Sequence, residues 1–365
     1  MPDDQPDQLD SIIKNSRPQN GDPPEALKTP HNYLTFDRLG DPLDDPTSAF
    51  NTGSDGHVGV SDPDTVLGVV VRKVEPTTPE AIESDLAEMR AADAKAGTDS
   101  SSYIPDWTAV SVTPALAPRI DPTRLVRRNG TRVRPECVIL PDNRSSYYPN
   151  SYPWNCVGRL FVWSNASSPG WDNSGTAALL GTRTILTASH MVPWGSSNWK
   201  ALFIPAYYNG SSLYGSSAAS WVTNAQGYSN HSQGDDMAVM RLAAPLGTSF
   251  GYFGCRTYNS AWEDQSVFTL PGYPGDKDNA ERPWLHLNFP IIDDDNDGAG
   301  VELEYRGDAY HGQSGAPVFA WFNGSPDVVG THSGCEDNPG EPMQNCAAGG
   351  SALTNLVSWA RSTWP

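Results

Sequence analysis

The pattern of hydrophobic and polar positions divides the chain near residue 137. After that point, short apolar runs alternate with segments rich in Gly, Asn, Ser and Pro, and no amphipathic helical pattern separates the runs. Runs of this length and spacing predict antiparallel strands in an all-β barrel or sandwich. The predicted strands are 157–163, 176–181, 184–188, 201–205, 237–242, 266–270, 284–292, 301–305 and 328–332. One helix is predicted to close the chain, from Leu353 to about Arg361.

The first part of the chain has a different texture. Residues 1–64 are rich in Pro, Asp, Gly and Asn with no sustained period, which predicts disorder because so little apolar surface can be buried. Residues 65–95 predict a small β-α unit, with a strand at 65–71 followed by a helix that Thr78 caps. Residues 96–137 are then a linker.

Composition excludes several function classes. The formal net charge of −19 argues against nucleic acid or an anionic membrane as a partner, since both need a basic surface. No stretch is long and apolar enough to cross a bilayer. The first residues lack the basic and apolar regions of a secretory signal, so the true start is missing or export takes another route.

The five cysteines, at 137, 156, 255, 335 and 346, are widely spaced and include no Cys-x-x-Cys pair. This spacing excludes zinc-finger and thioredoxin-like sites. It is typical of a few disulfides formed in an oxidising compartment, with one thiol left over.

A candidate nucleophile lies in Gly312-Gln313-Ser314-Gly315, directly before an apolar strand start. Glycines on both sides of a serine allow a tight turn that aims backbone N–H groups at a developing oxyanion. By itself Gly-x-Ser-Gly is common in surface turns, so its meaning depends on a base and an acid elsewhere in the chain.

The candidate base is His190, which follows an apolar strand that ends in small residues, Thr187-Ala188-Ser189. A rigid strand end with small neighbours leaves room for a substrate. The candidate acid is Asp236, placed at the start of the apolar run 237–242. A buried Asp beside the histidine accepts one imidazole N–H and stabilises the imidazolium.

In this order, the three segments resemble the motifs of trypsin-fold serine peptidases. The runs Val138–Arg144, Leu270–Lys277 and Gly330-Thr331-His332 resemble signatures of the glutamyl endopeptidases within that fold. The resemblance covers 138–365 and implies two packed antiparallel six-stranded β-barrels, with the active site in the cleft between them and a C-terminal helix.

The resemblance also implies a role for each residue. Ser314 is the nucleophile, His190 is the general base and acid, and Asp236 orients the histidine. The backbone N–H groups of Gly312 and Ser314 form the oxyanion hole. The chain is then a serine endopeptidase that needs no cofactor and acts on proteins or peptides.

Substrate preference is less clear from the motifs. His332, after Thr331, matches the histidine that meets a substrate carboxylate in glutamyl endopeptidases. That family tends to carry Thr or Ser where this chain has Ala309, and Asp308 lies where trypsin-like enzymes select Arg or Lys. An Asp in the pocket would repel Glu and attract a guanidinium. We expect a Glu preference, with a basic preference as the alternative.

Activation follows from the residue before the serine. Trypsin-like zymogens pair a new N-terminus with an Asp there, but this chain has the uncharged Gln313. In glutamyl endopeptidases the freed N-terminal Val helps to build the specificity pocket, so we expect cleavage close to Val138. Residues 1–137 are then a pro-region, and an activating protease is a possible partner.

Cleavage there would also remove Cys137, so that Cys156 could pair with Cys255 and Cys335 with Cys346. If Cys137 is retained, a pair between Cys137 and Cys255 is the alternative. We further expect a secreted monomer.

The acidic run Asp293, Asp295, Asp297-Gly298, followed by Glu304, matches the spacing of an EF-hand calcium loop. Strand-like runs flank it where helices would be needed, so we expect an acidic hairpin turn, with calcium as the alternative. Two other classes stay open: a catalytically silent trypsin-fold binding protein, and a calcium-regulated adhesion protein.

Overall fold

The computed structural model of the protein describes a β-rich domain and a few segments that precede it. The described residues are 5–7, 99–116, 138–139, 141–168, 170–194, 196, 198–215, 218–228, 232–336 and 342–365. The predicted β-α unit at 65–95 and most of the predicted disordered segment 1–64 lie outside these residues.

The first half of the domain is a closed six-stranded antiparallel barrel with the strand order β10-β5-β4-β3-β6-β9. Its strands are β3 (Val157–Trp163), β4 (Asn173–Leu179), β5 (Thr184–Thr187), β6 (Lys200–Pro205), β9 (Ser220–Gly227) and β10 (Ala238–Leu242). Five of the six match predicted strands. Strand β9 was missed because polar residues such as Asn224 and Gln226 interrupt its apolar pattern.

The second half is a ten-stranded sheet. Its main path is β1-β2-β13-β12-β16-β17-β18-β15-β14, and β11 pairs with β17 off this path. The strands are β1 (Ala115–Leu116), β2 (Ser145–Tyr148), β11 (Gly254–Cys255), β12 (Phe268–Gly272), β13 (Trp284–Phe289), β14 (Ile291–Asp297), β15 (Gly300–Tyr305), β16 (Pro317–Phe322), β17 (Ser325–Glu336) and β18 (Gln344–Gly349). The predicted run 284–292 is divided between β13 and β14 at Pro290.

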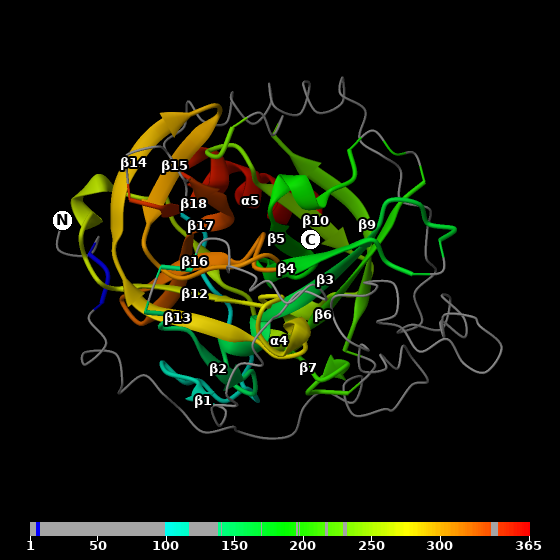
Figure 1. Ribbon diagram of the computed structural model, residues 1–365. Coiled ribbons are helices and arrows are strands. Elements are labelled where there is room, and N and C mark those ends of the chain that lie inside the picture. Colours follow the sequence, from blue (N-terminus) through cyan, green and yellow to red (C-terminus); the bar gives the residue numbers. More distant parts are fainter. Residues whose placement is uncertain are drawn as a thin grey trace, which may run out of the picture.

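Figure 1 shows the two halves side by side, the green barrel next to the yellow and orange sheet. The remaining elements are β7 (Tyr207–Tyr208), β8 (Ser211–Ser212), α4 (Leu246–Phe250), α5 (Ser351–Thr363) and the short 3-10 turns η5 (Trp154–Cys156), η6 (Ser189–Met191), η7 (Ser260–Trp262) and η8 (Asp278–Ala280). An all-β fold with a closed six-stranded barrel and a C-terminal helix confirms the predicted fold class.

Helix α5 joins the two halves. It contacts β5 and β10 of the barrel and β11, β15 and β18 of the sheet. Its Leu353, Leu356 and Val357 are fully buried. Arg361 donates to the carbonyl oxygen of Phe253 at 2.7 Å and also to that of Leu180. The helix therefore fixes how the two halves are placed, and with them the site between them.

Residues 99–116, predicted as part of a linker, are packed on the domain. Val110 and Val112 are buried, and β1 extends the sheet by pairing with β2. Further upstream, Asp7 Oδ2 accepts the amide of Gly324 at 2.7 Å. Apolar residues spaced through 99–116 give this predicted linker segment a surface to bury against the domain.

The predicted disulfides are also wrong. Cys156, Cys255 and Cys346 are buried free thiols, which rules out all three predicted pairs. The register of β17 and β18 explains why Cys335 and Cys346 do not pair. Cys346 lies opposite Gly334, so the side chain of the neighbouring Cys335 points to the other face of the sheet. Cys335 is not a free thiol, and Cys137 lies outside the described residues.

Candidate active site

Two adjacent barrel strands bring His190 and Asp236 together. Strand β5 ends at Thr187 and leads into η6, which carries His190, while Asp236 lies two residues before the start of β10. These strands are antiparallel neighbours, with Ala238 opposite Thr187. The end of one strand therefore meets the start of the other, and the two side chains meet at the same edge of the barrel.

The His190–Asp236 contact is short and doubled. Asp236 Oδ2 lies 2.6 Å from His190 Nδ1, and Oδ1 accepts the backbone N–H of His190 at 2.8 Å. Burial alone would raise the pKa of Asp236, but the hydrogen bonds and charge of His190 and a hydrogen bond from Ser333 outweigh it and lower the pKa. Asp236 is therefore ionised and fixes the orientation of the imidazole.

Ser314 lies in the loop between β15 and β16, on the sheet side of the site. Gly312 and Gly315 on either side of it have φ angles of +95° and +83°. A Cβ at Gly312 would lie 2.4 Å from the carbonyl oxygen of Tyr273, and one at Gly315 would lie 2.2 Å from Thr187 Oγ1. Both the conformation and the space therefore require glycine, which is why the Gly-x-Ser-Gly pattern is readable in the sequence.

Thr176 of β4 holds this loop against the barrel. Its Oγ1 donates to the carbonyl oxygen of Gly312 at 2.8 Å and accepts the amide of Tyr273 at 3.0 Å. Its own amide donates to the carbonyl oxygen of Ser314 at 2.9 Å. One barrel threonine thus fixes the serine loop relative to His190 and Asp236.

A single cavity contains the three predicted catalytic residues. Its lining residues are His190, Gln233, Asp236, Tyr310, His311, Ser314, His332, Ser333, Gly334 and Cys335. Ser314 Oγ is not hydrogen-bonded to His190 in this substrate-free structure. Such bonds are often long in free enzymes and tighten when substrate binds. His190 and Ser314 therefore share the cavity without a direct hydrogen bond between them.

The backbone amides of Gly312 and Ser314 donate no hydrogen bond to any other described residue. Both belong to the loop that carries the Ser314 side chain. Two N–H groups without a partner beside a serine hydroxyl can accept a developing negative charge on a substrate oxygen.

His332 lies on the wall of the cavity, on strand β17. Burial, followed by the nearby charge of His190, lowers its pKa to about 4. Its Nδ1 is 2.6 Å from the hydroxyl oxygen of Tyr305. His332 is therefore neutral at pH 7 in the absence of substrate. Of the other residues predicted for the pocket, Val138, Ala309 and Thr331 are buried and do not line the cavity.

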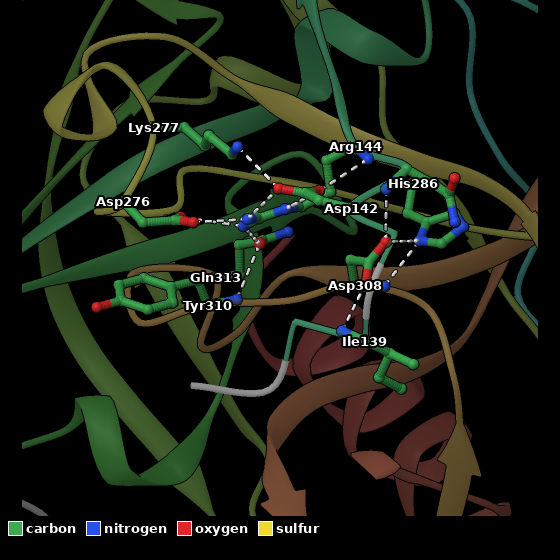
Figure 2. A network of polar contacts seen from close by, with 10 residues as sticks. Ile139, Asp142, Arg144, Asp276, Lys277, His286, Asp308, Tyr310 and Gln313 are labelled. Atoms are coloured by element: carbon green, nitrogen blue, oxygen red, sulfur yellow. Dashed lines mark hydrogen bonds and ion pairs between the residues drawn. The ribbon is translucent and has the colours of Figure 1, made fainter. Parts of the chain in front are cut away.

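Asp308 is the residue on which the alternative of a basic preference depends. Asp308 is fully buried, does not line the cavity, and accepts the backbone amides of Ile139 and Asn143 at 2.8 Å each (Figure 2). The carboxylate is thus committed to main-chain donors. The amides that Asp308 binds belong to the chain that follows Val138, so the carboxylate faces this chain and not the cavity.

Sequence reasoning missed two residues of the site. Ser333 Oγ lies 2.6 Å from Asp236 Oδ2, and Thr176 anchors the serine loop. Ser333 directly follows the Gly330-Thr331-His332 motif, so its place next to that motif could have identified it as a site residue. Thr176 had no such signal, because its role depends on a contact with residues more than 130 positions away.

The acidic run at 293–298 is a hairpin, as expected. Strand β14 extends through Asp297 and pairs with β15, with Asp293 opposite Glu304, and Gly298 makes the turn at a φ of +66°. Among the described residues, Glu302, Glu304 and Glu336 form a group whose carboxylate oxygens lie within 4.8 Å of one another. Only Glu304 of the predicted calcium ligands belongs to this group.

Comparisons with known proteins agree with this geometry. A family profile described as Trypsin matches residues 143–356. The glutamyl endopeptidase of Bacillus licheniformis is 28% identical over 234 residues, which cover 62% of this chain and 69% of that protein. The extracellular metalloprotease of Bacillus subtilis is 25% identical over 243 residues, covering 64% of this chain and 73% of that protein.

A solved structure of a Glu endopeptidase in complex with MPD superposes with a TM-score of 0.51 at 19% identity. The superposition covers 62% of this chain and 99% of the Glu endopeptidase chain. At this level of identity the likeness shows a shared fold. No helix among the described residues is long and apolar enough to cross a membrane.

Proposed function

The chain belongs to the trypsin family of serine endopeptidases, and from that premise we propose that it hydrolyses peptide bonds through an acyl-enzyme on Ser314. The observation that carries the proposal is the shared cavity, in which the buried Asp236 holds the half-exposed His190 beside Ser314. A buried acid, an oriented base and a serine on a glycine turn make up the arrangement needed for acyl transfer.

In the proposed mechanism His190 takes the proton of Ser314 as Oγ attacks the scissile carbonyl carbon. Asp236 accepts a hydrogen bond from the Nδ1 N–H, stays ionised, and stabilises the imidazolium that forms. His190 then returns its proton to the leaving amine, and water repeats the sequence on the acyl-enzyme. The amides of Gly312 and Ser314 bind the oxyanion, where loss of one donor typically costs about 3 kcal/mol of transition-state stabilisation.

We propose further that the enzyme prefers Glu before the scissile bond. Three histidines, His190, His311 and His332, line the cavity, and its single carboxylate, Asp236, is already bound to His190. A substrate carboxylate near His332 would raise the pKa of that histidine and form a charged hydrogen bond with it. With Asp308 bound to main-chain amides, the described lining of the cavity offers no further carboxylate to select a guanidinium.

We also propose that the protein acts outside the cell after cleavage close to Val138. The export proposal is supported by the Bacillus subtilis relative, which is named an extracellular metalloprotease. The cleavage proposal rests on the likeness of the Val138–Arg144 run to the mature start of glutamyl endopeptidases.

Cleavage-site profiling on a peptide library tests reaction and preference together. We expect cuts after Glu, abolished in Ser314→Ala and unchanged in preference in Asp308→Asn. Cuts after Arg or Lys that disappear in Asp308→Asn would overturn the proposed preference while leaving the peptidase intact. A processed protein that cuts nothing would leave a silent binding protein as the better account.

A further inference from the structure

Two buried side chains connect the segment 139–144 to the loop that carries Ser314. Asp308 begins this loop and holds the main chain of the segment, while Arg144 ends the segment and reaches the residue before the nucleophile (Figure 2). None of these contacts is used by the chemical steps proposed above.

Asp308 is a fully occupied anchor. Its Oδ1 accepts the amide of Ile139 and its Oδ2 accepts the amide of Asn143, both at 2.8 Å. Its own amide donates to His286 Nδ1 at 2.7 Å, and its Oδ2 lies 3.1 Å from the same nitrogen. A buried carboxylate is stable only with such donors, and here they are supplied by the chain after Val138.

Arg144 is the second anchor, with a side chain that is only 1% exposed. Its guanidinium contacts Asp276 at 2.6 and 3.0 Å and Asp142 at 3.0 Å, while Lys277 lies 2.7 Å from Asp142. Burial alone would raise the pKa of Asp142, yet Arg144 and Lys277 hold it well below its usual range. Two cations and two carboxylates therefore balance in a site from which water is largely excluded.

Gln313 connects this cluster to the catalytic loop. It is fully buried, and its Oε1 accepts the amide of Tyr310 at 3.1 Å and an Arg144 N–H at 3.5 Å. The amide of Gln313 returns to the carbonyl oxygen of Tyr310 at 2.9 Å. These bonds close the turn from Tyr310 to Gln313, within which the Gly312 amide lies and after which Ser314 follows.

We propose that Arg144 and Asp308 are positioning residues for the oxyanion-binding loop. They dock the segment after Val138 against this loop and, through Gln313 Oε1, set the direction of the Gly312 and Ser314 amides. The positive group that orders the Ser314 loop is then the guanidinium of Arg144. Because Arg144 hydrogen-bonds to an amide oxygen, this arrangement is compatible with the uncharged Gln313. The proposal rests on the proposed peptidase function and assigns residues that act before any substrate is bound.

The inference predicts a loss in kcat rather than in KM. A misdirected amide weakens binding of the oxyanion, which exists only in the transition state, and leaves ground-state binding of substrate alone. Misplacement by about 1 Å can lower a rate by about 100-fold. We therefore expect Arg144→Lys and Gln313→Leu to lower kcat by roughly 10- to 100-fold with KM within about threefold of wild type.

Two matched variants separate this role from stability. Gln313→Glu keeps an acceptor oxygen for Tyr310 and Arg144, so it should recover most of the kcat that Gln313→Leu loses. Arg159→Lys makes the same change in another largely buried pair, formed at 2.8 Å by Arg159 of β3 and Glu281, the residue after η8. Among the described residues, the side chains of this pair hydrogen-bond to Tyr207 and Ser174 and not to the serine loop. Arg159→Lys should lower the unfolding midpoint about as much as Arg144→Lys while leaving kcat within about twofold of wild type.

The measurement is kcat and KM of the wild-type chain and its variants on a peptide substrate after the same processing close to Val138, with thermal unfolding and fluorophosphonate labelling of each. Wild-type kcat in both Arg144→Lys and Gln313→Leu overturns the positioning role. So does an equal loss in Arg159→Lys, or a change confined to KM. A processed wild-type protein that neither labels nor hydrolyses overturns the proposed function instead, so the two failures are distinguishable.

Discussion

At the scale of single residues, the chemistry depends on how Asp236 is held. Its two oxygens receive the backbone and the ring of His190 and the hydroxyl of Ser333. These donors keep the carboxylate charged in a site where it is largely buried. The orientation of the base therefore depends on Ser333 as well as on the two residues that the sequence motifs identify.

Replacing Ser333 tests that dependence. In Ser333→Ala the carboxylate loses one donor, worth about 1.5–3 kcal/mol for a bond to a charged group, so kcat should fall by roughly 10- to 100-fold. Steady-state kinetics on one peptide substrate measure the change. Ser362→Ala, at the exposed end of α5, is the control and should behave as wild type. Equal kcat in the two variants would show that Ser333 does not support the base.

His332 predicts how stability depends on pH. Its pKa is about 4 in the folded protein and about 6.5 in an unfolded chain, so between these values the unfolded state binds more protons. Stability from this residue is complete above about pH 6.5 and is lost as the pH falls towards 4. The difference in pKa, at about 1.4 kcal/mol per unit, amounts to about 3 kcal/mol.

Urea unfolding between about pH 4 and about pH 6.5 measures this dependence. Ser314→Ala serves as the background, so that self-digestion does not interfere. Adding His332→Gln should flatten the rise of stability with pH in that window. An unchanged slope would mean that His332 is not held neutral by the fold.

At the scale of elements, residues 99–116, which precede Val138, are packed on the domain. Ser100, Tyr103 and Val110 each form a bridge with a residue of the domain, and β1 lengthens the sheet. None of the residues 99–116 lines the cavity. This segment therefore supports the fold without covering the site.

We expect residues 99–116 to stay bound after cleavage close to Val138. The bridges and the buried Val112 hold the segment independently of the chain between 116 and 138. After processing, the two fragments should co-elute in native gel filtration and separate under denaturing conditions. Val112→Asp should weaken their association. Release of the upstream fragment from an active wild-type enzyme would contradict this account.

Elements also show how far sequence reasoning reaches. Strands with continuous apolar runs, such as β3 and β10, were predictable because both faces are buried. Strand β18, Gln344–Gly349, was not, since its small residues Ala347, Ala348 and Gly349 carry no strong periodic signal. The packing of 99–116 was missed for another reason. Its apolar residues are isolated in the sequence, so their burial could be predicted only with knowledge of the surface that they contact.

At the scale of the whole molecule, the site depends on the fixed placement of the barrel relative to the sheet. The barrel supplies His190 and Asp236, and the loop before β16 supplies Ser314. Thr176 bonds across this boundary, and α5 packs on both sides of it. The three catalytic candidates were predictable because each lies in a local motif at the end of a strand. The anchoring by Asp308 and Arg144 was not, because it joins segments more than 160 residues apart.

The central claim is that Ser314 is the activated nucleophile, and covalent labelling tests it most directly. The measurement is the intact mass of the purified protein after reaction with a fluorophosphonate, followed by peptide mapping. We predict one adduct per chain, located on Ser314, absent in Ser314→Ala and strongly slowed in Asp236→Asn, where about 10⁴-fold is the scale seen for loss of the orienting acid. An unlabelled wild-type protein, or an adduct on another residue, would contradict the account.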